Sequence, residues 1–244
     1  MLLPIGKPPA RFETAALATV AIGTIVVGLL LDQHWRHGQW VVSLWTWALL
    51  AVLLAKTPAT HRVELVACLL IAGTGEVICA LFWGAYEYRL GNVPLFVPPG
   101  HVLLFWLGTR VVLALSQSQQ RLLVRLTIAS SVALGAALGA FDVDRLSLAL
   151  VVILLVCIAK GREPVLYTVM FWLALVMELY GTALGNWHWA ATTPLIGLSA
   201  ANPPFAAGVF YAVLDLLVGA VGRAWRKFRP PAAQPTPPTS VLSV

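Results

Sequence analysis

Long apolar stretches constrain this chain more than any other feature of its sequence. Eight runs approach the roughly 20 residues that an α-helix needs to cross a bilayer, at about 14–31, 40–55, 62–84, 100–115, 122–140, 145–160, 164–184 and 204–222. Only 11% of the residues are charged, whereas a soluble domain carries about 25%. The sequence therefore predicts an all-α, polytopic integral membrane protein with about eight transmembrane helices. The second and sixth runs are the shortest.

Most of the basic residues lie in or near the connections on one side of the predicted spans. In an eight-span arrangement one side of the membrane receives Lys7, Arg11, Lys56, Arg62, Arg121, Arg125, Lys160, Arg162, Arg223, Arg226, Lys227 and Arg229, and the other receives Arg36, Arg89 and Arg145. The positive-inside rule then places both termini in the cytoplasm, for which a bacterial inner (plasma) membrane is the expected location. Because the net charge of +6 is distributed in this way, we expect no nucleic-acid partner.

Two loops of similar composition occur in the chain, "GAYEYRLGNVPLFVPPGH" at 84–101 and "GNWHWAATTPLIGLSAANPPF" at 185–205. The matched positions are Gly84 with Gly185, Tyr86 with Trp187, Tyr88 with Trp189, and Pro98–Pro99 with Pro203–Pro204. Upstream, Glu76 matches Glu178; downstream, counted from the second proline, Phe105 matches Phe210, Trp106 matches Tyr211, and Arg110 matches Asp215. Glycine permits a tight exit from each preceding helix.

These matches predict a duplicated four-helix unit. The first unit covers 1–118 and the second 119–222, followed by a disordered, basic and Pro-rich cytoplasmic tail at 223–244. With an even number of spans in each unit, the repeats are parallel and related by a pseudo-two-fold axis along the membrane normal. The two aromatic loops should then meet near that axis at the outer face.

Four ionisable side chains lie inside the predicted spans, where a charge costs several kcal/mol and indicates function by default. They are Glu76, Arg110, Glu178 and Asp215, and the helical rise places them in one layer. Arg110 is always charged and should pair with one carboxylate, while the others share a proton or are protonated. We take these four as candidate catalytic residues. A structural Arg110–Asp215 clasp and glutamates used only in packing are the alternatives.

Candidate substrate-binding residues surround this layer in the sequence: Tyr86, Tyr88, His101, Trp106, Trp187, Trp189, Asn202 and Tyr211. Aromatic rings among them could stabilise a carbocation by cation–π attraction. His101 and His188 lie at the outer loops, and neither HxxxH nor HxxE spacing supplies further metal ligands. We therefore expect neither a metal nor another cofactor.

The first motif, Glu76 followed by "GAYEYRLGNVPLFVPP", resembles the Glu, G-x-Y-x-Y, Leu-Gly, VP…P pattern of the bacterial carotenoid hydratase-type membrane family. Like the membrane lycopene cyclases, these proteins act on isoprenoid chains without a redox cofactor. The second motif, "ELYGTALGNWHW…NPP", is similar to stretches of uncharacterised bacterial polytopic membrane proteins. The resemblance implies proton-initiated addition to a lipid double bond, with Glu76 and Glu178 at the family's acidic position. Trp in place of Tyr and a longer second loop depart from the pattern.

Three functions remain open at this point. An enzyme acting on an isoprenoid or related lipid requires an apolar cavity between the halves, lined by these residues and open to lipid. An accessory or structural subunit of a larger membrane complex requires an exposed complementary face for other membrane subunits and no cavity. A small proton-coupled transporter requires a polar route to both sides.

Overall fold

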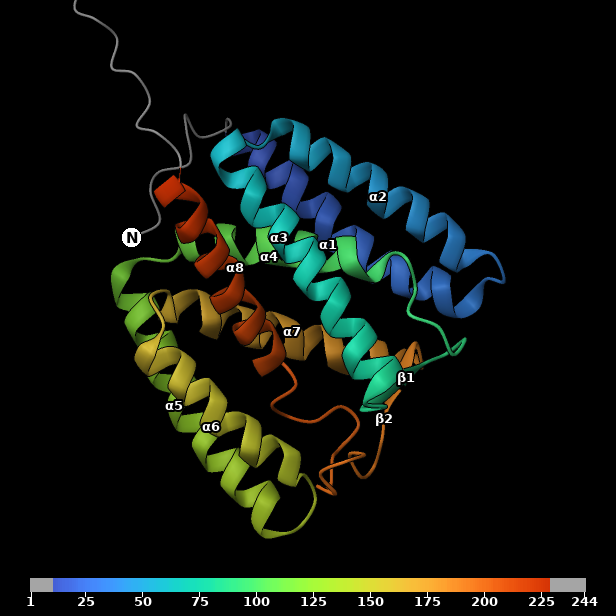
Figure 1. Cartoon of the computed structure of the whole chain (residues 1–244), viewed down its shortest axis with the longest axis vertical. Coiled ribbons are helices and arrows are strands. Elements are labelled where there is room, and N and C mark those ends of the chain that lie inside the picture. Colours follow the sequence, from blue (N-terminus) through green and yellow to red (C-terminus); the bar gives the residue numbers. More distant parts are fainter. Residues whose placement is uncertain (1–10, 229–244) are drawn as a thin grey trace, which may run out of the picture.

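The computed structural model describes residues 11–228, with side chains from residue 15 onward. This part of the chain is mostly helical and contains eight α-helices: α1 (Arg11–His34), α2 (Gly38–Lys56), α3 (Ala59–Glu76), α4 (Val97–Ala114), α5 (Gln117–Ala140), α6 (Arg145–Lys160), α7 (Pro164–Leu184) and α8 (Val209–Phe228). A π-helix, η1 (Val77–Phe82), continues α3, and two short strands are β1 (Tyr86–Tyr88) and β2 (Trp187–Trp189). Each predicted apolar run corresponds to one of these helices (Figure 1).

Six of the described helical segments are long and apolar enough to cross a membrane. The two that fall outside this group are α6, which has 16 residues, and α8, which carries Asp215 within it and a basic last turn. The chain therefore has the helices of a multi-pass membrane protein. Helix α2, predicted from one of the shortest apolar runs, has 19 residues and belongs to the six.

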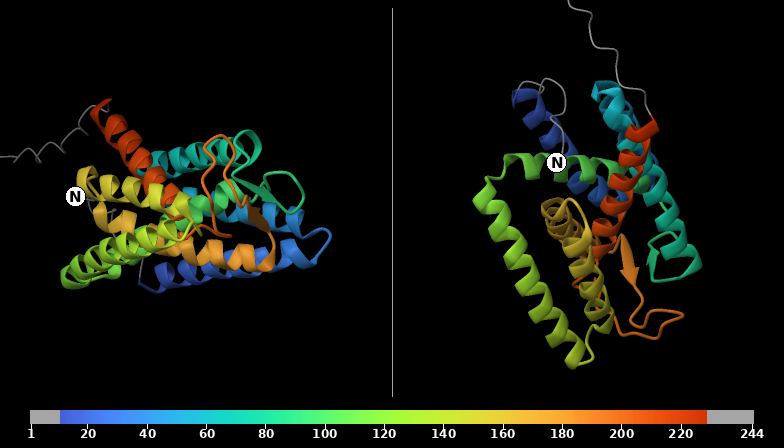
Figure 2. Two further views of the ribbon diagram at one scale, coloured as in Figure 1. Left: turned by 90° about the horizontal axis from the view of Figure 1, so that it is seen from below. Right: turned by 60° about the vertical axis from the view of Figure 1, so that its left-hand side comes forward.

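Helices α3, α4, α7 and α8 form the centre of the molecule. Helix α3 packs against α4 and α8, and α7 packs against the same two helices. The α1–α2 hairpin lies on α4, and α1 also contacts α7, whereas the α5–α6 hairpin lies on α7 and α8 (Figures 1 and 2). The two hairpins contact the centre differently. Helix α1 packs against α4, the fourth helix of the first half, whereas α5 packs against α7, the third helix of the second half.

Local sequence signals account for the ends of several helices. Pro98 and Pro99 occupy the first turn of α4, where a missing N–H leaves no hydrogen bond unmade. Ser116 and Gln119 form a reciprocal capping box at the start of α5. Asp144 caps α6 by accepting a hydrogen bond from the Ser147 amide at 2.9 Å.

The two aromatic loops meet, as the sequence predicts. Strands β1 and β2 pair antiparallel, with Tyr86 opposite Trp189 and Tyr88 opposite Trp187. Both loops leave their helices through a glycine in the left-handed region, Gly84 at φ 68° and Gly185 at φ 83°, which other residues adopt at a cost. The all-α prediction therefore lacked this small antiparallel ribbon.

The predicted tail begins too early. Helix α8 continues through Arg223 and ends at Phe228, so 223–228 belongs to the last helix. Arg226 in this segment donates to the Glu64 carboxylate at 2.7 Å, which anchors the end of α8 to α3. The rest of the predicted tail, 229–244, lies outside the described residues, as does Lys7.

Candidate active site

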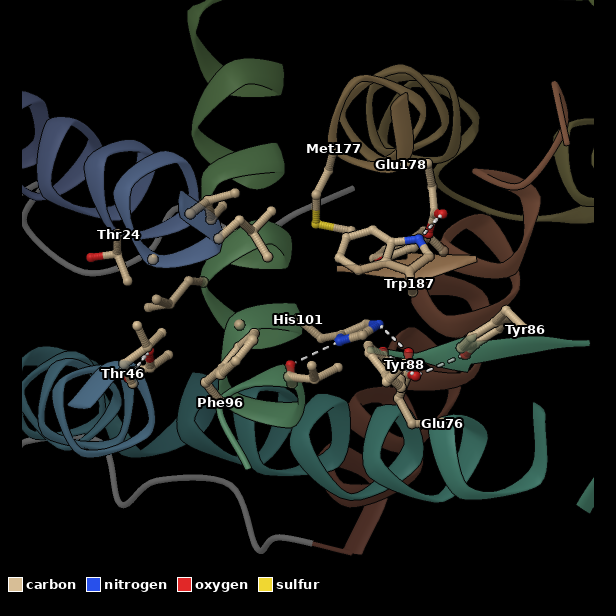
Figure 3. Close-up of a pocket in the computed structure, with 18 residues that line it drawn as sticks. Thr24, Thr46, Glu76, Tyr86, Tyr88, Phe96, His101, Met177, Glu178 and Trp187 are labelled. Atoms are coloured by element: carbon tan, nitrogen blue, oxygen red, sulfur yellow. Dashed lines mark hydrogen bonds and ion pairs between the residues drawn. The ribbon is translucent and has the colours of Figure 1, made fainter. Parts of the chain in front are cut away.

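Glu76, the last residue of α3, is 8% exposed and is surrounded by hydrogen-bond donors. Its Oε2 accepts hydrogen bonds from the Tyr86 hydroxyl at 2.8 Å and the Tyr88 hydroxyl at 2.7 Å. Its Oε1 lies 3.2 Å from His101 Nε2 (Figure 3). Both oxygens of this carboxyl are therefore engaged by the protein.

His101 lies one turn into α4, and its ring orientation is fixed on three sides. Nδ1 is 2.9 Å from the Val97 carbonyl, which can only accept, so Nδ1 carries a hydrogen and donates it. The ring stacks on Tyr211 with centroids 4.9 Å apart and planes within 4° of parallel. One proton is therefore shared between His101 Nε2 and Glu76 Oε1, and we refer to these two residues as the Glu76–His101 pair.

The phenols of β1 lie outside the helices that can span a membrane. Burial, followed by the charge of the Glu76 carboxylate, raises the pKa of both Tyr86 and Tyr88 well above the usual tyrosine value. Both side chains therefore keep their hydroxyl hydrogens at neutral pH and remain donors to Glu76.

Glu178 occupies the corresponding place on α7 and is also 8% exposed. Its Oε2 accepts hydrogen bonds from the indole N–H groups of Trp187 at 2.8 Å and Trp189 at 3.0 Å. Within the described part of the chain, no hydrogen-bond donor reaches Oε1 of Glu178. One oxygen of Glu178 is therefore unoccupied, in contrast to Glu76.

The π-helix explains how the two glutamates reach equivalent positions. Eight sequence positions separate Glu76 from Gly84, and seven separate Glu178 from Gly185. The first path contains η1, whose wider turns hold an extra residue, whereas α7 stays α-helical up to Gly185. In each half the carboxylate then meets the two aromatic donors of the strand that follows. Such π-turns often mark functional sites.

Both glutamates line one pocket, which has about 630 Å³ of unfilled space counting its open side. Figure 3 shows the polar end, formed by Glu76, Tyr86, Tyr88, His101, Glu178 and Trp187. Tyr211 joins this end, and the rest of the lining is Thr24, Ile25, Gly28, Leu29, Val42, Thr46, Phe96, Val97, Gly100, Leu103 and Met177. The pocket thus takes residues from both sequence halves and extends between α1 and α2.

The two threonines at the far end of the pocket offer it little polarity. Thr46 donates its hydroxyl hydrogen to the Val42 carbonyl at 2.6 Å. Thr24 donates to the Val20 carbonyl at 2.8 Å and accepts from Trp45 Nε1 at 2.9 Å. Because both hydroxyl hydrogens are used within helices, this end has no free side-chain donor, and its surroundings are aliphatic and aromatic.

Arg110 and Asp215 lie outside the pocket lining. The expected ion pair between Arg110 and a carboxylate is not formed among the described residues: the guanidinium lies 5.3 Å from the centroid of the Trp106 ring, and its Nε is buried without a hydrogen-bond partner. Asp215 is 2% exposed, and neither of its oxygens has a partner in this part of the chain. The cation beside a carboxylate in the pocket is instead His101.

Two further predicted binding residues stand behind the site. Trp106 packs in the core and does not line the pocket. Asn202 accepts a hydrogen bond from the Trp189 amide at 2.9 Å and contacts His188 Nδ1 at 2.8 Å. Asn202 therefore holds β2 in place and does not reach the cavity.

A buried cluster beside the ribbon had not been expected from the sequence. Asn186 donates to Asp32 Oδ2 at 2.8 Å and to the Leu29 carbonyl at 3.0 Å, and Arg89 lies 3.3 Å from Asp32 Oδ1. This cluster ties the end of α1 to both strands. Its partners are far apart in sequence, and the one available signal was that Asn186 stands where the first loop has Ala85.

Among residues 15–228, no group of three or more His, Cys, Asp or Glu side chains is arranged to hold a metal ion. No protein-family model, no curated protein and no solved structure matches the chain.

Proposed function

We propose that the protein is an integral membrane enzyme that acts on an isoprenoid or related lipid by carboxylate-mediated proton transfer, as in hydration, cyclisation or isomerisation. The observation that supports this best is the pocket between the sequence halves, which brings Glu76 and Glu178 to one polar end. A subunit with a purely structural role has no need of such a cavity. Positioned groups that give and take protons are the main requirement of general acid–base catalysis.

The kinds of side chain around the carboxylates favour an alkene as the reacting group. A proton added to a branched double bond leaves a tertiary carbocation, which is the least costly type, and such bonds recur along isoprenoid chains. The rings of Tyr86, Tyr88 and Trp187 line the same end of the pocket, and aromatic faces attract cations. A straight saturated acyl chain offers no comparable site for protonation.

The lining also favours one orientation of the ligand. The reacting group would lie by the carboxylates, and the apolar remainder would extend between α1 and α2 toward Thr24 and Thr46, whose hydroxyl hydrogens are already used. A lipid with one reactive end suits this pocket better than one with polar groups at both ends, because a buried polar group without a partner is costly. The likeness of "GAYEYRLGNVPLFVPP" to carotenoid hydratase-type proteins agrees with such a ligand.

The same proposal includes eight spans arranged as two repeats, with the ribbon at the outer face of a bacterial inner membrane and both termini in the cytoplasm. It is supported by the antiparallel pairing of β1 with β2 and by the alternation of the basic residues along the chain. Single cysteines introduced at Glu87 and at Gln117 test the sidedness. A membrane-impermeant thiol reagent applied to intact cells should label the first position and not the second.

The decisive experiment is to purify the full chain in mild detergent and to identify bound lipids by mass spectrometry. The wild type should carry an isoprenoid that is altered in chemical identity or amount in Glu76→Gln and Glu178→Gln. Glu64→Gln is the matched control, because Glu64 pairs with Arg226 and does not line the pocket. Co-purification of a stoichiometric protein partner, with no specific lipid and no change in either pocket variant, would indicate an accessory subunit and overturn the proposal.

A further inference from the structure

We propose that Glu178 is the proton donor, carrying the transferable hydrogen on Oε1, and that the Glu76–His101 pair is a fixed neighbour that keeps its own proton. The catalytic part of this assignment rests on the proposed function. The location of the proton does not, because it can be measured in the resting protein.

The Glu76–His101 pair offers no free hydrogen to the pocket. Oε2 of Glu76 already accepts two phenol hydrogens, and Oε1 faces His101 Nε2 at 3.2 Å. The other hydrogen of the ring is directed to the Val97 carbonyl. The two phenol hydrogen bonds stabilise the carboxylate form of Glu76, so the shared proton resides on His101 Nε2 and is directed at Glu76 Oε1 rather than into the pocket.

Glu178 is built differently. Two indole N–H groups are directed at Oε2, which leaves Oε1 as the carboxyl oxygen in the pocket without a donor from the described residues. No cation pairs with Glu178 in this part of the chain. A buried carboxyl group that has neither a cationic partner nor a donor on each oxygen takes up a proton, because leaving its charge isolated in the protein interior costs more than protonation does. That proton belongs on Oε1, because Oε2 is occupied as an acceptor.

The transfer then balances without a cofactor. The π electrons of the alkene form a new C–H bond with the Glu178 hydrogen, the O–H bond breaks, and a carbocation and a Glu178 carboxylate remain. The two indole N–H groups stabilise that carboxylate in the absence of water. When the cation, or a water molecule that has added to it, loses a proton, the proton returns to Glu178.

Infrared difference spectroscopy of the full-length protein at neutral pH tests the assignment. A protonated carboxyl group has a carbonyl stretch that moves to lower frequency in D2O, and ionised carboxylates do not absorb there. Asp215 also lacks partners, so the measurement is made in Asp215→Asn. In that background we expect one remaining acid band, which is lost in Glu178→Gln and kept in Glu76→Gln. Absence of the band, or its loss in Glu76→Gln with persistence in Glu178→Gln, overturns the assignment.

A second variant guards against misfolding of the glutamine variants. Trp187→Phe removes one hydrogen bond to the carbonyl oxygen and keeps the acid, so the band should move to higher frequency. Tyr86→Phe, which changes a donor to Glu76, should leave it in place. A shift in the tyrosine variant but not in the tryptophan variant contradicts the proposal. If the band behaves as expected but no isoprenoid is bound, the proposed function fails and the proton assignment stands. If an isoprenoid is bound but the band is absent, the proton assignment fails and the proposed function stands.

Discussion

The two glutamates of the pocket occupy similar backbone positions, each before an aromatic strand, but they accept hydrogen bonds from different kinds of side chain. Glu76 receives phenol hydrogens and a histidine, whereas Glu178 receives indole hydrogens alone. A phenol oxygen can both donate and accept hydrogen bonds, whereas an indole N–H can only donate. Both kinds of group act here as donors to a carboxyl oxygen, and the histidine is what Glu76 has in addition.

The absence of a second histidine has a simple origin in the sequence. Counted from the second proline of each loop, His101 corresponds to Ala206, so Glu178 has no imidazole to share a proton. Two carboxyl groups in one pocket can then differ in charge although their backbone positions are alike. This difference is what separates a proton donor from a fixed ion pair.

The largest effect should come from altering the helix that lacks a π-turn. Deletion of Leu179 from α7 rotates everything after it by roughly 100° and should prevent folding. Deletion of Val77 lets η1 relax to an α-helix and should be tolerated, because the first path then has the length of the second. Both residues are exposed, so they form a matched pair. The yield of monodisperse protein on size exclusion measures the outcome, and equal loss in both cases would contradict the interpretation of η1.

The next effect concerns stability. Glu76→Ala breaks a buried ion pair and should lower the free energy of unfolding by about 3–5 kcal/mol. Glu178→Ala leaves two indole N–H groups unpaired and should cost about 1–3 kcal/mol. Denaturant unfolding in detergent measures both losses. A larger loss of stability for Glu178→Ala than for Glu76→Ala would contradict the greater contribution expected from the Glu76–His101 pair.

Removal of a single hydroxyl should have a smaller effect. Tyr88→Phe deletes a hydrogen bond to a charged acceptor and is expected to cost about 1.5–3 kcal/mol. Tyr180→Phe serves as the control, since its hydroxyl donates at 3.0 Å to the neutral Val26 carbonyl at an exposed site, and should cost about 0.5–1.5 kcal/mol. Thermal unfolding of both variants decides whether the charge of Glu76 strengthens its phenol contacts.

The smallest expected effect is a loss of stability at alkaline pH, with no change at neutral pH. The unfolded chain loses phenol protons near pH 10, but the raised pKa of Tyr86 and Tyr88 keeps theirs bound in the folded protein. The contribution of these two phenols to the free energy of unfolding should therefore be fully present below about pH 10 and be lost as the pH rises further. The double variant Tyr86→Phe/Tyr88→Phe should show a shallower decline, and tyrosinate absorbance should show two fewer late-titrating phenols. An unchanged slope would argue against their burial beside Glu76.

Much of the fold followed from apolar runs and turn residues. Each of the eight runs gave a helix, and the repeated glycine–aromatic spacing located both strands that meet. The helix ends were harder to predict, because the sequence placed the start of the fourth span at 100, whereas α4 begins at Val97. That shift moves His101 from the edge of a loop to one turn inside a helix, where it faces Glu76.

The candidate site was predicted less completely. Glu76, Glu178 and their aromatic neighbours were identified because intramembrane charges are rare and because their spacing repeats. Arg110 was expected to pair with a carboxylate, yet it lies over the ring of Trp106, four residues earlier on the same helix face, because the sequence does not show which neighbouring helix that face meets. The apolar end, including Thr24 and Met177, had no signal at all, because such residues are ordinary in any membrane helix.

The ribbon makes opening of one cluster inseparable from opening of the other. Each strand carries the donors of one glutamate, and the strands are held together by their own ladder, extended by the Arg89 amide to the Asn186 carbonyl at 2.9 Å and the Ala190 amide to the Ala85 carbonyl at 3.0 Å. Fraying of this ladder would remove the phenol donors of Glu76 and the indole donors of Glu178 in a single event. In amide hydrogen exchange, β1 and β2 should therefore behave as one cooperative unit, with a common opening rate shared by two segments a hundred positions apart.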